Sequence, residues 1–410
     1  MTAKETIELK GHIIDSMILP KVFDIIIEEE GDFEVLNFDI GKKKTETSYA
    51  KILVKGKNEE HLTNILQKLQ KLGAIISIPK DCEVEIADKD GCAPENFYPT
   101  TNQKTYVRID GKWVLVENQK MDAAIVIKEY EENGKIKKVP VCTLLRDIKK
   151  GDKVVVGFEG IKIEPIERSR EPMGIFGFMR SETSTEKPTL TLVREVAKEM
   201  KKVKKEGGKI GVVCGSAVVH TGASRALAGI IEKNYVDAFF AGNAVAVRDI
   251  EYELYGTSLG MNINTGKVEE YGYRKHIATI NLVRREGGIK ALIEKGILKQ
   301  GIMYSLITKN IPFVLAGSIR DDGPLPEVIT DVCKAQDEMR KLLNDLNLVL
   351  MMGSLLHSIA VGNMMRADIK TICVDIDPAV VTKLRDRGTS QAIGIITDLG
   401  TFIPALLNEL

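Results

Sequence analysis

The chain has 410 residues, of which 44% are hydrophobic and 28% are charged, so we expect a soluble globular protein of two or three domains. Its 58 basic and 58 acidic residues cancel, which argues against a nucleic-acid or anionic-lipid partner. No apolar run approaches the roughly 18 residues that span a membrane. The first residues, Met1–Glu5, lack the apolar core of a secretory signal, so we expect a cytoplasmic protein.

The first 80 residues follow the order strand, helix, two strands, helix, strand. The predicted elements are Thr6–His12, Leu19–Glu29, Asp32–Ile40, Ser48–Lys55, Glu59–Leu72 and Ala74–Pro79. This order predicts a split βαβ, ferredoxin-like module over residues 1–80. Because such modules occur in many regulatory and dimerising proteins, we expect an oligomerisation or scaffold unit, and the fold alone assigns no task.

Short β runs separated by turns replace this pattern over residues 81–167. The runs are Thr105–Arg108, Trp113–Val116, Ala123–Glu129, Lys137–Cys142 and Lys153–Phe158. Asp110-Gly111 and Asn133-Gly134 are strong hairpin signals. We therefore predict a small β-barrel or sandwich domain, in which the polar and aromatic loop Cys92–Thr101 is a candidate for facing a ligand.

Residues 168–188 have no steady period, contain three arginines and end in a Ser/Thr-rich stretch, which predicts an interdomain linker. A plain solvated linker has no need of the apolar run Ile175–Met179. A segment that lines a cleft between domains is therefore an equal alternative. An amphipathic helix over Thr189–Glu206 follows, and its Lys-rich face is most simply solvated surface.

Six short apolar runs in residues 189–410 each stop at a Gly, Ser, Asn or Asp. The runs are Ile210–Cys214, Val236–Ala241, Phe313–Ala316, Leu348–Met352, Ile372–Val374 and Ile393–Thr397. Their length is typical of strands buried on both faces, and the helical stretches Ser224–Lys233, Leu325–Asn344 and Ala379–Arg387 predict βαβ crossovers. Since open parallel sheets bind ligands beyond the carboxyl ends of their strands, we predict a Rossmann-like α/β domain that binds a nucleotide.

The glycine fingerprint of dinucleotide-binding folds, Gly-x-Gly-x-x-Gly, follows none of these strands. The nearest substitute is Gly215–Ser224, a strand-to-helix turn whose N–H groups and hydroxyls suit a phosphate. The alternative is an ordinary loop in which Ser224 is the N-cap of the next helix. After the second strand, Gly242-Asn243-Ala244 lets a ligand approach the backbone closely. Its alternative is a turn with Asn243 in a left-handed conformation.

Titratable side chains follow the third and fourth strands. The loop Ser318–Pro326 carries an arginine and two acids that no core requires, and for Asp321 a solvated turn is an equal reading, less so for Asp322. His357 lies just beyond a buried strand, and imidazole suits proton transfer near neutrality. A lone histidine is, however, more often simply hydrogen-bonded.

Acidic residues end the last two strands. Asp375 and Asp377 follow the fifth strand, and Asp398 follows the sixth. Dinucleotide-binding folds place the acid that binds the ribose hydroxyls at such a strand end. The alternative is that each acid caps the next helix.

Other kinds of site have little support. The six cysteines form no C-x-x-C pair, which indicates reduced and mostly structural thiols. With five histidines, no H-x-x-x-H and no cysteine cluster, we expect no metal site. Serine-hydrolase chemistry is unsupported because the chain has no Gly-x-Ser-x-Gly.

Five segments together resemble a known family, the archaeal NAD-dependent ornithine cyclodeaminases. They are Cys92–Pro94, Phe176–Arg180, Gly242–Ala244, Ser318–Pro326 and Ser354–His357. The first part of the chain is similar to the region named for the lysine-ketoglutarate reductase/saccharopine dehydrogenase bifunctional enzymes. The whole chain also resembles the C-terminal half of cyanobacterial fusions that carry an arginine dihydrolase in front.

The resemblance implies conversion of L-ornithine to L-proline and ammonia, through transient oxidation to an imine by NAD⁺, ring closure and hydride return. It also implies a deoxyhypusine-synthase-like NAD-binding fold, which would explain the missing glycine fingerprint. By position, the cofactor contacts it implies are Asn243, Ala244, Asp322, Ser354, Leu355, Leu356, His357, Asp375 and Asp398. The acids at the ribose positions favour NAD over NADP, because they repel a 2′-phosphate.

The reaction also needs a proton acceptor and a clamp for the substrate's α-carboxylate. We predict Asp322 or His357 for proton transfer. The predicted clamp is an arginine, because guanidinium binds a carboxylate through two hydrogen bonds, and the candidates are Arg168, Arg170 and Arg180.

Two other functions remain open at this point. A NAD-dependent amino-acid dehydrogenase of the lysine or saccharopine type would accumulate NADH with turnover. A non-catalytic protein that senses NAD or an amino acid would bind its ligand without releasing ammonia. For any of the three, a homo-oligomer is the expected assembly, as in many parallel-sheet enzymes with dimerising modules.

Overall fold

The computed structural model describes residues 3–43, 46–77, 79–132, 135–165, 189–263, 265–267, 272–321, 323–387, 389 and 391–410. These residues form two compact units, which are considered separately. The first holds the described residues up to 165 together with Arg366–Asp368, and the second holds the other described residues from 189 onward.

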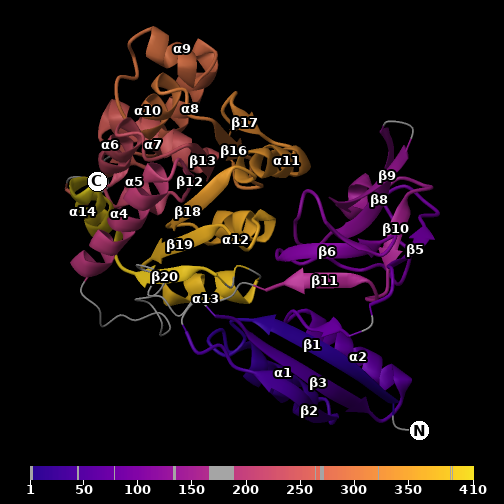
Figure 1. Ribbon diagram of the computed structural model, residues 1–410. Helices are drawn as coiled ribbons and strands as arrows, with labels where there is room; N and C mark the ends of the chain where they lie inside the picture. Colours follow the sequence, from indigo (N-terminus) through magenta and orange to yellow (C-terminus); the bar gives the residue numbers. More distant parts are fainter. Residues whose placement is uncertain are drawn as a thin grey trace. The chain divides into compact units, whose positions relative to one another are not determined.

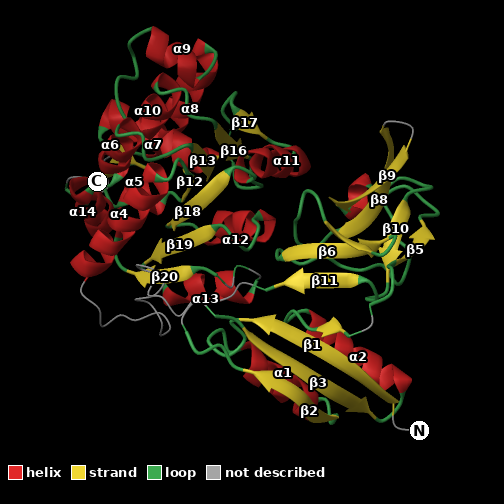
Figure 2. Ribbon diagram, in the orientation of Figure 1, coloured by secondary structure: helices red, strands yellow, loops and turns green. Residues whose placement is uncertain are grey.

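An antiparallel four-stranded sheet with two helices opens the first unit (Figures 1 and 2). Its elements are β1 (Ala3–Gly11), α1 (Ile18–Glu28), β2 (Asp32–Asp39), β3 (Ser48–Gly56), α2 (Glu59–Gln70) and β4 (Ile75–Ile76). The strand order β2-β3-β1-β4 is that of the predicted split βαβ fold. Alternate residues of β3, such as Ile52 and Val54, are buried with Val22 of α1 and Ile65 of α2, so the helices cover one face of the sheet.

Two small antiparallel sheets complete the first unit. Their strands are β5 (Glu83–Ile86), β6 (Lys104–Ile109), β7 (Lys112–Leu115), β8 (Ala124–Glu132), β9 (Lys135–Thr143), β10 (Lys153–Val156) and β11 (Ile161–Glu164), with a 3-10 turn at Leu145–Asp147. They pair in the orders β5-β10-β8-β9 and β11-β6-β7. Asp110 and Gly111 both have positive φ, as a two-residue β6–β7 hairpin requires. Asn133-Gly134 lies outside the described residues.

The strands β5 and β11 are not predicted from the sequence. In β5, charged and apolar residues alternate, but Val84 and Ile86 are exposed like the two glutamates, so pairing with β10 rather than burial defines the strand. In β11, buried and half-buried side chains alternate, and the strand pairs with β6. Both strands are therefore products of tertiary pairing.

The second unit alternates strands and helices. In chain order it contains α4 (Thr189–Lys205), β12 (Lys209–Cys214), α5 (Ala217–His220), α6 (Ser224–Glu232), β13 (Ala238–Gly242), α7 (Asn243–Tyr255), β14 (Thr257–Ser258), β15 (Met261–Asn262), α8 (Tyr273–Glu286), α9 (Ile289–Glu294), α10 (Ile302–Thr308), β16 (Phe313–Ala316), β17 (Val328–Ile329), α11 (Val332–Leu343), β18 (Leu346–Met352), α12 (Leu355–Met364), β19 (Lys370–Asp375), α13 (Pro378–Asp386), β20 (Ile393–Ile396) and α14 (Leu399–Glu409).

Seven of these strands form a parallel sheet in the order β17-β16-β13-β12-β18-β19-β20. The chain starts at the centre with β12, proceeds outward through β13 and β16, then returns to the centre at β18 and proceeds the other way. Apart from the edge strand β17, this is the Rossmann order, which reverses between β12 and β18. The predicted Rossmann-like parallel sheet is confirmed.

Two helical layers bury the faces of this sheet (Figure 1). One face packs against α4, α6, α7, α10 and α14 around Phe239, Leu350 and Phe402. The other face packs against α11, α12 and α13, around Phe240, Met351 and Val381. Burial on both faces explains why the strands are continuous apolar runs rather than alternating ones.

The predicted helix Leu325–Asn344 is wrong in its first turns. Val328–Ile329 forms the edge strand β17, which pairs with β16, and the helix starts only at Val332. Asp331 sets that start, because its carboxylate accepts hydrogen bonds from the N–H groups of Cys333 and Lys334.

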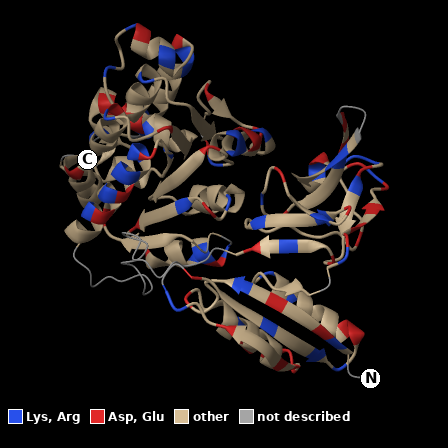
Figure 3. Ribbon diagram, in the orientation of Figure 1, with Lys and Arg blue, Asp and Glu red and all other residues tan. Residues whose placement is uncertain are grey.

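Acidic and basic residues are interspersed over the ribbon of both units (Figure 3). Many of them pair across neighbouring elements, for example Lys204 with Asp237 at 2.8 Å. Within the described part of the chain, no helix combines the length and the apolarity needed to cross a bilayer.

Candidate functional site

The carboxyl ends of β12 and β18 meet where the strand order of the large sheet reverses. There the N–H of Gly215 donates to the carbonyl of Met352 over 2.7 Å. A Cβ added to Gly215 would lie 1.7 Å from the carbonyl oxygen of Gly353, so the two loops touch backbone to backbone. Gly353 itself has φ 62°, a left-handed conformation that favours glycine. The loops after β12 and β18 can pack this closely only because Gly215 has no side chain.

The loop after β18 leads directly into α12. The hydroxyl of Ser354 accepts a hydrogen bond from the N–H of His357 over 3.3 Å, which makes Ser354 the cap of this helix. Leu355 and Leu356 supply further N–H groups of the first turn, and such groups favour an anion. The side chain of Leu356 is 73% exposed.

His357 reaches from the first turn of α12 to the end of β13. A Cβ on Gly242 would lie 2.9 Å from its Cε1 and 3.1 Å from its Nε2, so the imidazole rests on this glycine. Its Nδ1 lies 3.3 Å from the hydroxyl of Ser354. Burial lowers the pKa of His357, and the carboxylate of Asp321 opposes this effect only in part. The ring is therefore neutral near pH 7.

Asn243 and Ala244 open helix α7 at the end of β13. The buried amide of Asn243 accepts from the N–H of Leu325 over 3.1 Å and donates to the carbonyl of Gly323 over 3.4 Å. Its side chain therefore holds the loop after β16. Ala244 is half-buried beside it. The left-handed turn considered for Asn243 is wrong, because this residue is helical.

The acids at the ends of β19 and β20 have different partners. Among the described residues, the carboxylate of Asp375 accepts only from the N–H of Asp377, over 3.0 Å. Asp377 caps α13 through the N–H of Ala379. Asp398 caps α14 through the N–H of Thr401, over 3.0 Å. The capping alternative therefore holds for Asp398 and Asp377 but not for Asp375.

Ser224 does not cap its helix, contrary to the alternative considered for the Gly215–Ser224 turn. Ser224 is fully buried within the first turn of α6, and its hydroxyl donates to the carboxylate of Asp249. That carboxylate also accepts from the N–H groups of Ile302 and Met303, over 3.1 and 2.8 Å. Burial raises the pKa of Asp249 to about 6 in spite of these bonds. We assign both side chains to the packing of α6, α7 and α10.

Four predicted site residues, Asp322, Arg168, Arg170 and Arg180, lie outside the described residues. Asp321, which precedes Asp322 in the chain, accepts from the N–H of Ser318 over 2.9 Å, which is the turn role considered for it.

A polar cluster beside Asn243 and Ala244 is not among the site residues predicted from the sequence. It comprises His220 at the end of α5, Arg248 and Glu251 on α7, Ser258 on β14 and His276 on α8. The hydroxyl of Ser258 lies 3.0 Å from Nδ1 of His220, and His276 lies 3.2 Å from Glu251. One signal is available in the sequence, since Arg248 follows Ala244 by one helical turn and so shares its face.

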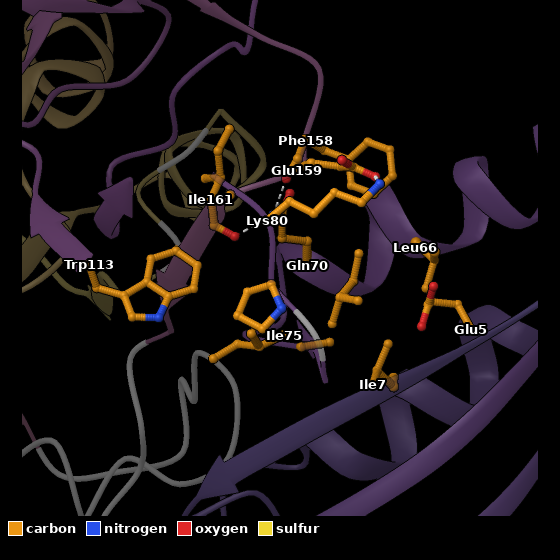
Figure 4. Close-up of a pocket in the computed structure, with 14 residues that line it drawn as sticks. Glu5, Ile7, Leu66, Gln70, Ile75, Lys80, Trp113, Phe158, Glu159 and Ile161 are labelled. Carbon is orange, nitrogen blue, oxygen red and sulfur yellow. Dashed lines mark hydrogen bonds and ion pairs between the residues drawn. The ribbon is translucent and has the colours of Figure 1, made fainter. Parts of the chain in front are cut away.

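The first unit contains a separate cavity of about 70 Å³ (Figure 4). Trp113, Phe158 and Leu66 lie around it, and Lys80 pairs with Glu159 at its rim over 3.2 Å. The amide of Gln70 is already bonded to the carbonyls of Phe158 and Ile161. No group of three or more metal-ligating side chains occurs here or elsewhere in the described residues.

Three family models match successive parts of the chain. Residues 4–103 match the "LOR/SDH bifunctional enzyme conserved region". Residues 104–193 match "Arginine dihydrolase ArgZ-like, C-terminal, first region", and residues 194–406 match "Arginine dihydrolase ArgZ-like, C-terminal, Rossmann fold". The last match alone covers more than half of the chain.

The chain is 55% identical to an ornithine cyclodeaminase of Methanocaldococcus jannaschii over 409 residues, which cover 98% of this chain and 95% of the relative. The apo structure of ArgZ, a cyanobacterial arginine dihydrolase, matches with a TM-score of 0.84 and 38% identity; the match covers 100% of this chain and 58% of that one. The ternary complex of AgrE, from Nostoc sp., with ornithine and NAD⁺ matches with a TM-score of 0.53 and 40% identity, over 100% of this chain and 57% of AgrE.

These likenesses confirm the resemblance drawn from the sequence motifs. The match to the archaeal relative extends over nearly the full length of both proteins, whereas ArgZ and AgrE are longer. The chain belongs to the archaeal ornithine cyclodeaminase family.

Proposed function

We propose that this protein converts L-ornithine to L-proline and ammonia with NAD⁺ as a catalytic cofactor. The observation that carries the proposal is the end-to-end identity of 55% with an ornithine cyclodeaminase. It is supported by the AgrE complex, in which a relative of the whole chain holds ornithine and NAD⁺. The lysine-type dehydrogenase and the sensing protein have no comparable support.

The carboxyl edge of the large sheet fits a dinucleotide. Gly215 lets the loops after β12 and β18 pack backbone to backbone at this edge, because an added Cβ would overlap the carbonyl group of Gly353. The N–H groups of the first turn of α12 suit the pyrophosphate. Asp375 has one carboxylate oxygen without a partner among the described residues, and this oxygen suits a ribose hydroxyl. Bound there, NAD⁺ supplies a hydride acceptor and afterwards a hydride donor, so it is not consumed.

We propose the same cofactor contacts as those predicted from the sequence. They are Asn243, Ala244, Asp322, Ser354, Leu355, Leu356, His357, Asp375 and Asp398. For Asn243, the contact we propose is through its backbone, because both ends of its amide already hold the loop after β16. For Asp398, capping of α14 occupies one oxygen and leaves the other for the cofactor.

We propose His357 as the group that takes up the proton released from the α-ammonium group of ornithine. Its neutral ring at the end of β13 supports this role. Asp322 and Arg180 remain predictions from the sequence, as do a cytoplasmic location, a homo-oligomeric state and domain limits at residues 80, 167 and 188.

Asp375 and Asp398 should respond differently to substitution. Asp375→Ala should raise the Kd for NAD⁺ by roughly 10-fold or more, because a charge-assisted hydrogen bond is worth about 1.5–3 kcal/mol, with little loss of stability. Asp398→Ala should also weaken NAD⁺ binding, and in addition it should cost about 1 kcal/mol of stability through the lost cap. Fluorescence titration with NAD⁺ and thermal unfolding measure the two effects, and equal effects of both variants on stability alone would contradict the ribose role of Asp375.

The function itself is tested with purified, cofactor-stripped protein and L-ornithine. We expect proline and ammonia in equal amounts, only when a trace of NAD⁺ is added, and no lasting absorbance from NADH. Accumulation of NADH in proportion to product would establish a dehydrogenase instead. Tight NAD⁺ binding without turnover would favour the sensing protein.

A further inference from the structure

Three basic side chains follow neighbouring strands at the carboxyl edge of the large sheet. His220 ends α5 after β12, Arg248 lies on α7 after β13, and Arg320 lies in the loop after β16. None of them is among the predicted cofactor contacts. Since β12, β13 and β16 are adjacent, these side chains gather on one side of the switch point, away from β19 and β20.

Arg248 is placed to reach that edge. It shares a face of α7 with Ala244, one turn earlier, and helical side chains lean toward the N-terminus, here toward the end of β13. Its Nε is buried, and no described residue accepts a hydrogen bond from it. A buried Nε without an acceptor among the described residues costs free energy that a bound anion would return.

Among the described residues, Glu251 is the carboxylate whose charge acts on Arg248, but its oxygens are hydrogen-bonded to other groups. Glu251 is fully buried, and both of its oxygens are occupied. One oxygen accepts from Thr257 and Gly260, over 2.9 and 3.0 Å. The other oxygen accepts from Leu259 over 3.1 Å and lies 3.2 Å from His276.

Arg320 is the second charged neighbour of Arg248 among the described residues. Burial lowers the pKa of Arg248, the charge of Glu251 opposes this effect, and the charge of Arg320 adds to it. Burial and the charge of Arg248 also lower the pKa of His220, so that ring is neutral near pH 7 and adds no second charge beside the guanidinium. Nδ1 of His220 is engaged by Ser258, which fixes the ring.

We propose that Arg248 binds the α-carboxylate of the amino-acid substrate, in a subsite completed by His220 and Arg320. The inference rests on the proposed function and deepens it. The arginines predicted from the sequence as the clamp for the α-carboxylate lie in residues 168–180, and Arg248 is not among them. A carboxylate fits better than a cofactor phosphate, since the guanidinium fork matches its two oxygens and the N–H groups of α12 already suit the pyrophosphate.

The test compares Arg248→Gln with the parent protein and with Arg225→Gln, a matched control. Arg225 lies on α6 of the same unit, its side chain is 58% exposed, and it pairs with Glu253 of α7 over 3.3 Å. For Arg248→Gln, we expect the KM for ornithine to rise roughly 10- to 100-fold, with a smaller change in kcat and an unchanged Kd for NAD⁺. The control should keep the parent values.

Binding is measured separately from turnover by calorimetry on the NAD⁺-loaded protein. The probe is 5-aminopentanoate, which keeps the carboxylate and the distal amine of ornithine but has no α-amine to be oxidised. Arg248→Gln should weaken this probe by the same factor as ornithine. Putrescine, which lacks the carboxylate, should bind parent and variant equally.

The outcomes separate the inference from the proposed function. A parent protein that binds 5-aminopentanoate through Arg248 but releases no proline would support the subsite and contradict the cyclodeaminase. An active parent whose Arg248→Gln variant keeps its KM and probe affinity would overturn the subsite alone. A variant that loses affinity for NAD⁺ rather than for the probe would assign Arg248 to the cofactor and likewise overturn it.

Discussion

A Gly215→Ala variant should lose about 3 kcal/mol or more of stability in the second unit, together with most of its affinity for NAD⁺. The new Cβ would lie 1.7 Å from the carbonyl oxygen and 2.3 Å from the carbonyl carbon of Gly353. Both are backbone atoms, so no side-chain rotation relieves the overlap. The loops after β12 and β18 must separate, and this breaks the hydrogen bond from Gly215 to Met352. The cradle proposed for the dinucleotide is then lost.

Thermal unfolding and titration with NAD⁺ measure these effects. The matched control is Gly207→Ala, at a glycine with φ 77° and no atom within 4 Å of an added Cβ. That variant bears only the strain of a left-handed residue, about 1 kcal/mol. If Gly215→Ala were as stable as this control and bound NAD⁺ normally, the contact between the loops would not be what forms the site.

The large sheet is predicted well from the sequence, because strands buried on both faces are continuous apolar runs. The six runs correspond to β12, β13, β16, β18, β19 and β20, each within a few residues. The seventh strand, β17, has two residues and only partial burial, so nothing in its composition separates it from the adjacent loop. Its pairing with β16 is decided in three dimensions.

The candidate site is predicted less completely, because its parts act through partners that are distant in the chain. The close approach of Gly215 to Gly353 joins residues from two strands, so no single motif records it. Likewise, Asn243 is correctly placed at the end of β13, but its contact with Gly323 and Leu325 depends on how the loop after β16 folds back. Arg248 is missed because it lies in a helix and follows no strand end directly.

His357→Gln should lower kcat/KM by roughly 10²- to 10⁴-fold, the usual contribution of a general base, while changing NAD⁺ affinity much less. Glutamine keeps polar atoms near Ser354 and Gly242 but cannot accept a proton. The control is His12→Gln in the first unit, which should leave the rate unchanged. A His357→Gln variant with the parent rate would mean that the ring only packs against Gly242.

The pH dependence gives this assignment a second test. Burial lowers the pKa of folded His357 below the ordinary value of about 6.5, and Asp321 is the charged group that opposes it. The active neutral ring should therefore persist below pH 6.5, and kcat/KM should fall only as the pH drops through the lower, folded pKa. In His357→Gln this acidic limb should disappear or move.

Stability follows the same titration with a definite sign. Below about pH 6.5 the unfolded chain binds a proton at His357 before the folded protein does, so stability should decline as the pH falls and level off below the folded pKa. Above pH 6.5 this histidine contributes no slope. His220 has a lowered pKa for a similar reason and adds to the decline, so His357→Gln should reduce the acid sensitivity of the second unit without removing it. Thermal unfolding of parent and variant between pH 5 and 8 measures the difference, and identical slopes would show that His357 titrates as an ordinary exposed histidine, which would remove the basis for its role as a neutral proton acceptor.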